Sequence, residues 1–95
     1  MKRILIIEDD VSILSGLRDV LTFKSYEVVT AEDGESGYAA ALETRPDLII
    51  LDIMIPKMDG FALCRKLREE GRSTPVLMLT AKGEEPDKVR GLDIG

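Results

Sequence analysis

The chain has 95 residues, of which 44% are hydrophobic and 33% are charged, and its formal net charge is −5. These values are typical of one soluble globular domain with a single modest core. The negative charge argues against broad binding of this segment to nucleic acids or to anionic membranes. The sequence has no histidine, which excludes His-based acid–base catalysis and His-ligated metals, and its single cysteine, Cys64, excludes an internal disulfide.

The first half of the chain predicts two strands, each followed by a helix. Residues 3–7 predict a first strand, and its apolar run at residues 4–7 suits burial on both faces. The run is only four residues long and leads directly into acids, so it is neither a signal peptide nor a membrane span. We therefore expect a cytoplasmic protein. Asp9 or Asp10 can cap the next helix. Its apolar residues recur at helical spacing, namely Val11, Leu14, Leu17 and Leu21.

The next elements follow the same alternation of strand and helix. Residues 27–30 predict a second strand, and Asp33 can cap a helix over residues 35–43. The inner face of this helix would carry Tyr38, Ala41 and Leu42. Pro46 ends the helix and admits a third strand over residues 48–51.

The last third of the chain predicts a turn, a helix, a strand and a final helix. Pro56, Asp59 and Gly60 indicate the turn, and Gly71 is placed to end the helix that follows it. The inner face of that helix would carry Phe61, Cys64 and Leu67. Residues 75–79 predict a fourth strand and residues 84–93 a fourth helix. Strands that alternate with helices indicate a parallel α/β sheet with right-handed crossovers.

Acidic residues follow two of the apolar runs. Glu8 and Asp9 come after the first run, and Asp52 comes after the run at residues 48–51. If the two strands are parallel neighbours, their carboxyl ends share one edge of the sheet and the three carboxylates crowd together. Like charges held so closely need a cation or a proton. An all-oxygen set of this kind suits Mg²⁺, and Mn²⁺ can substitute.

Such a site could take part in phosphoryl transfer. An ionised Asp52 beside a divalent ion can attack phosphorus and form an acyl phosphate. Thr80 follows the fourth strand and offers a hydroxyl to a phosphoryl oxygen, and the small Ala81 allows close approach to its backbone N–H. Simpler interpretations stay open: Asp10 and Asp59 suit caps or turns, and Asp52 or Thr80 alone could be an ordinary residue at a strand end.

Four segments of the chain resemble the receiver domain of two-component response regulators. They are residues 4–10 (ILIIEDD), 46–52 (PDLIILD), 54–60 (MIPKMDG) and 75–82 (PVLMLTAK). Asp33-Gly34 and residues 91–95 look most like the winged-helix branch, which is also called OmpR/PhoB-like. The resemblance covers residues 1–95 as one receiver domain. It implies a flavodoxin-like, doubly wound parallel sheet of βα repeats, with strands ordered 2-1-3-4 and the fifth βα unit missing.

The resemblance also implies residue roles and partners. Asp52 would be the phospho-acceptor, and Thr80 would be the switch hydroxyl that moves toward the phosphoryl group. Glu8, Asp9, Asp52 and the backbone carbonyl of Met54 would bind Mg²⁺. The donor would be a phosphohistidine on a sensor histidine kinase, and the module would be a phospho-acceptor rather than an enzyme. DNA binding would belong to a C-terminal domain outside this chain.

The missing fifth unit leads to further expectations. The lysine that family members carry on the fifth strand is absent, and Lys82 is expected to face solvent. The fourth strand would be an exposed edge, which predicts self-association as a homodimer or by exchange of elements. One alternative is a fragment that folds or assembles without being phosphorylated. Another is an Asp-nucleophile phosphatase, although Met54 stands where such enzymes have a second Asp. Flavin binding fits poorly with the acidic loop after the first strand.

Overall fold

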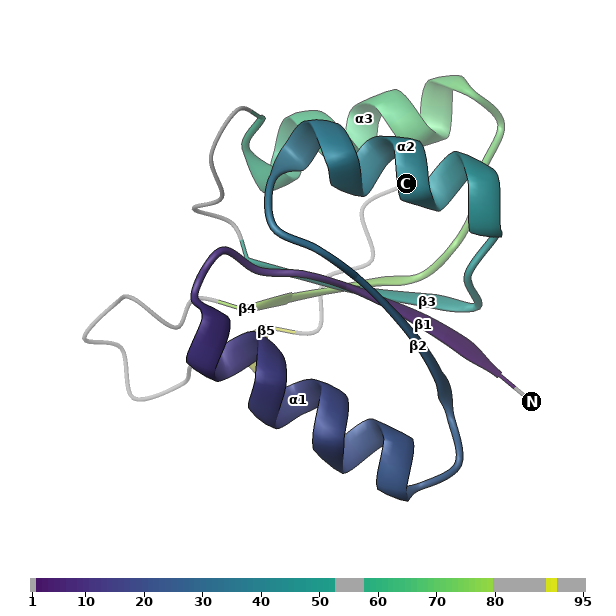
Figure 1. Ribbon diagram of the computed structural model, residues 1–95. Helices are drawn as coiled ribbons and strands as arrows, with labels where there is room; N and C mark the ends of the chain where they lie inside the picture. Colours follow the sequence, from purple (N-terminus) through teal and green to yellow (C-terminus); the bar gives the residue numbers. More distant parts are fainter. Residues whose placement is uncertain (1, 53–57, 80–88, 91–95) are drawn as a thin grey trace.

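The computed structural model describes residues 2–52, 58–79 and 89–90, which form three layers (Figure 1). A sheet is the middle layer. Helix α1 (Val11–Phe23) covers one face, and α2 (Gly34–Thr44) and α3 (Gly60–Glu69) cover the other. The parallel strands are ordered β2 (Glu27–Ala31), β1 (Arg3–Ile7), β3 (Leu48–Asp52) and β4 (Val76–Leu79). The predicted strand order 2-1-3-4 is confirmed.

Strand β1 lies inside the sheet and is buried on both faces. Leu5 and Ile7 join the core beneath α2 and α3, whereas Ile4 and Ile6 join Leu14 of α1 on the other face. Successive side chains of a strand point to opposite faces, so a strand that is covered on both sides needs apolar residues at every position. This is why the run at residues 4–7 is continuous rather than alternating.

Aspartates cap all three helices, as the sequence predicts. The side chain of Asp10 accepts hydrogen bonds from the backbone N–H groups of Ser12 (2.9 Å) and Ile13 (3.3 Å) at the start of α1. Asp33 and Asp59 do the same for α2 and α3, each over 2.8 Å. These bonds satisfy donors that have no partner within the helix. Asp10 and Asp59 therefore have the capping roles that the sequence left open.

Two residues that helical spacing places in apolar stripes of the predicted helices are exposed instead. Val11 of α1 is 64% exposed and Phe61 of α3 is 40% exposed. In α3 the buried apolar side chains are those of Leu63, Cys64 and Leu67. Successive residues of an α-helix are separated by about 100° around its axis, so the centre of these three side chains lies roughly 110° away from Phe61. The predictions were wrong because helical spacing defines a stripe of apolar residues, but packing decides which part of the stripe meets the sheet.

The C-terminal helix predicted over residues 84–93 is wrong at Val89 and Arg90. These two residues form β5, which pairs antiparallel with β4, with Met78 opposite Arg90 and Leu79 opposite Val89. The unpaired backbone groups on the outer edge of β4 explain this pairing, because a helix would leave them without partners. The expectation that the fourth strand has an exposed edge is therefore also wrong at Met78 and Leu79, which pair with β5. The other residues of the predicted helix lie outside the described residues.

Candidate functional site

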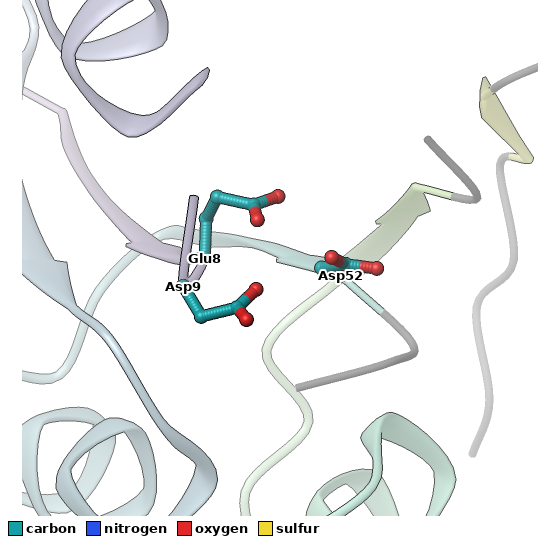
Figure 2. A group of neighbouring side chains, drawn as sticks. All are labelled: Glu8, Asp9 and Asp52. Carbon is teal, nitrogen blue, oxygen red and sulfur yellow. The ribbon is translucent and has the colours of Figure 1, made fainter. Parts of the chain in front are cut away.

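Three acidic side chains meet at the carboxyl edge of the sheet (Figure 2). Glu8 and Asp9 follow β1, and Asp52 is the last residue of β3. The two strands are parallel neighbours, with Ile7 opposite Leu51, so their ends differ by only one residue. One carboxylate oxygen from each acid lies within 4.8 Å of those from the other two. The structure thus brings together the three acids that the sequence selected.

The three carboxylates differ in their exposure to solvent. Glu8 and Asp52 are completely buried, whereas Asp9 is exposed. At 4.8 Å, two unit charges repel by about 3 kcal/mol if the effective dielectric constant is about 20. Two buried carboxylates at that spacing therefore favour a nearby cation. Asp9 is the member of the set that contacts solvent.

Local hydrogen bonds direct Glu8 toward the site. Its backbone N–H donates to the carbonyl of Ala31 over 3.0 Å, which continues the β1–β2 pairing beyond the end of β1. Its Oε2 accepts a hydrogen bond of 2.9 Å from the backbone N–H of Asp10. The sequence did not indicate the role of Ala31, since the predicted second strand stopped one residue earlier. The β-propensity of Ala is low, so only the pairing identifies it as a strand residue.

The donor set fits a hard divalent cation. All three ligand atoms are carboxylate oxygens, which Mg²⁺ and Mn²⁺ prefer. Oxygens that share an octahedral Mg²⁺ lie about 3–4 Å apart, because each metal–oxygen distance is about 2.1 Å. The observed limit of 4.8 Å is close to this range, and Mg²⁺ usually retains several waters as further ligands. Glu8, Asp9 and Asp52 could therefore hold such an ion.

The other predicted site residues lie outside the described residues. These are Met54, Thr80 and Ala81, together with Lys82. For Thr80, the register of the sheet gives its place in the sequence relative to Asp52. Asp52 stands opposite Leu79 in the β3–β4 pairing, and Thr80 is the next residue in the sequence.

The model of the response regulator receiver domain family matches residues 4–95. The chain belongs to this family. Receiver domains generally bind Mg²⁺ and interact with sensor histidine kinases. In the part of the chain that the structure describes, no helix is long and apolar enough to cross a membrane.

Similar curated proteins are transcriptional regulators of the expected OmpR/PhoB-like branch. The chain is 48% identical over 94 residues to the alkaline phosphatase synthesis transcriptional regulatory protein PhoP of Bacillus subtilis, covering 99% of this chain and 39% of that protein. It is also 48% identical over 97 residues to the DNA-binding dual master transcriptional regulator RpaA of Synechocystis sp., covering 100% of this chain and 40% of that protein. The chain thus spans about two fifths of the length of these relatives.

A solved structure confirms the receiver domain fold. The chemotaxis response regulator CheY4 of Vibrio cholerae matches with a TM-score of 0.83 and 36% identity, covering 90% of this chain and 72% of that one. The predicted family and its flavodoxin-like fold are therefore confirmed by both sequence and structure.

Proposed function

We propose that this receiver domain, which comprises residues 1–95, accepts a phosphoryl group on Asp52 in a Mg²⁺-dependent reaction. The observation that carries the proposal is the meeting of Glu8, Asp9 and Asp52 at the ends of two neighbouring strands. Asp52 suits the nucleophile because β3 lies between β1 and β4 in the sheet. The other two acids lie on one side of Asp52, and the end of β4 lies on the other.

The donor in this proposal is a phosphohistidine of a sensor histidine kinase. One Oδ atom of Asp52 forms a bond to phosphorus while the nitrogen–phosphorus bond of the donor breaks, and the electron pair of that bond returns to the imidazole. Bound Mg²⁺, or Mn²⁺ in its place, would neutralise the charge that gathers on the carboxylate and phosphoryl oxygens. Glu8, Asp9 and the backbone carbonyl of Met54 would hold the ion beside Asp52. Thr80 and the backbone N–H of Ala81 would donate to phosphoryl oxygens.

In the whole protein, phosphorylation would be relayed to a DNA-binding output domain in the cytoplasm. This part of the proposal rests on the regulators to which the chain is similar. Self-association is a separate prediction, and its support is weaker at Met78 and Leu79, where β5 pairs with β4. Sedimentation velocity tests it directly, and a monomer at every concentration would exclude it.

Phosphorylation by a small-molecule donor tests the acceptor. The protein is incubated with acetyl phosphate and Mg²⁺, and its intact mass is measured. We expect one phosphoryl adduct in the wild type, and no adduct in Asp52→Ala or when a chelator removes Mg²⁺. The matched control is Asp10→Ala, which removes a neighbouring carboxylate that caps α1 and should retain the adduct. An adduct that persists in Asp52→Ala would refute the assignment.

A further inference from the structure

The first residue of α2 packs against the chain just before α3. Gly34 is buried, and a Cβ atom placed on it would overlap the Cβ atom of Met58. The same Cβ would lie 2.6 Å from the carbonyl oxygen of Met58 and 3.0 Å from its Cα. Two of these three atoms are backbone, so they cannot turn aside as the end of a flexible side chain can. Only glycine allows α2 and the start of α3 to approach so closely.

This contact is linked to the acidic site through the end of β2. The carbonyl of Ala31, three residues before Gly34, accepts the hydrogen bond from the backbone N–H of Glu8. Met58 follows Asp52 in the sequence after the five residues 53–57. The short β2–α2 connection therefore holds Glu8 by a hydrogen bond and Met58 by packing. Asp33 fixes the start of α2 through its cap bond to Ser36.

Met58 is also held in place by packing against the hydrophobic core. Its partly buried side chain packs against the core cluster beneath α2 and α3. Asp59, the next residue, caps α3. Because Met58 is held in this way, a methyl group added to Gly34 would displace the start of α2. The displacement would reach Glu8 through Ala31, whose carbonyl accepts the hydrogen bond from the Glu8 backbone.

We propose that Gly34 is a positioning residue for the divalent-ion site. It touches neither the ion nor the phosphoryl group. It fixes the start of α2 against Met58, and the nearby carbonyl of Ala31 holds the backbone of Glu8 at the end of β1. This inference rests on the proposed function of the three acids, and it adds a residue outside the acidic cluster on which ion affinity depends.

Three glycine-to-alanine variants test the proposal by ion affinity. Binding of Mn²⁺ is measured from the electron paramagnetic resonance signal of the free ion, and Mg²⁺ is measured by competition. Residues that support metal ligands typically change affinity by 10–100-fold, and we expect Gly34→Ala to weaken binding about tenfold. The controls Gly16→Ala and Gly71→Ala place the new methyl group in open space, and both should keep wild-type affinity.

Gly71→Ala also controls for a general loss of stability. Gly71 has a φ of +80°, and an alanine there is strained although nothing obstructs its methyl group. This variant should unfold more easily than the wild type and still bind the ion normally when folded. Wild-type ion affinity in Gly34→Ala would overturn the proposal. An equal loss of affinity in Gly71→Ala would overturn it as well.

A second measurement needs no bound ion. Amide hydrogen exchange of Glu8, whose backbone N–H bonds to Ala31, is compared in the metal-free proteins, and we expect faster exchange in Gly34→Ala but not in Gly71→Ala. If the wild type fails to bind Mn²⁺, the proposed function fails, while the exchange rates still decide whether Gly34 positions Glu8. If Gly34→Ala does not fold, Met58→Gly removes the facing Cβ without adding atoms. Met58→Gly should show the same changes in ion affinity and amide exchange, but smaller ones. A wild-type exchange rate in Met58→Gly would overturn the inference.

Discussion

Removal of one buried carboxylate should stabilise the metal-free protein. Glu8 and Asp52 are completely buried, and their ligand oxygens lie within 4.8 Å of each other. The repulsion at that distance is about 3 kcal/mol at an effective dielectric constant of about 20. Other interactions of the two acids offset part of this repulsion, so we expect Asp52→Asn to raise the free energy of unfolding by about 1–2 kcal/mol. For a domain of this size, each kcal/mol raises Tm by about 4–8 °C.

Urea unfolding in the presence of a chelator, and again with excess Mg²⁺, measures this effect. In the proposed function the ion binds tightly only to the folded wild type, so Mg²⁺ should stabilise the wild type and have much less effect on Asp52→Asn. Glu43→Gln is the matched control, because it removes one negative charge from an exposed position on α2. It should leave both measurements close to the wild-type values. Lower metal-free stability in Asp52→Asn, or equal stabilisation of both proteins by Mg²⁺, would refute the reasoning.

Two further predictions concern residues outside the acidic cluster. Asp10→Ala removes the cap of α1 and should lower the free energy of unfolding by about 1 kcal/mol, as measured in urea; an unchanged value would show that the cap contributes nothing. Partial burial, followed by the carboxylate of Glu70, raises the pKa of Tyr38 above 10.0. Because the folded state favours the protonated phenol, stability should fall as the pH rises above that value. An ultraviolet absorbance titration should find a lower pKa in Glu70→Gln, and an identical titration in both proteins would contradict this.

The features that the sequence predicts well are local ones. A continuous apolar run such as residues 4–7 indicates a strand buried on both faces, because no position in it tolerates solvent. Caps are equally local, since Asp10 and Asp33 bond to backbone groups within three residues. Strands that alternate with helices require a parallel sheet, so the meeting of acids at its carboxyl edge could also be inferred. Each of these inferences depends only on spacing along the chain.

The remaining features depend on contacts between distant parts of the chain. The burial of Glu8 and exposure of Asp9 are set by the elements that pack around them, although the two residues are neighbours in the sequence. Residues 89–90 pair with β4 and do not form the predicted helix, because the open edge of β4 offers hydrogen-bonding groups. The approach of Gly34 to Met58 joins two helix starts across 24 residues of sequence, from position 34 to position 58. Spacing along the chain carries no information on such distances, because they result from how the helices and the sheet pack.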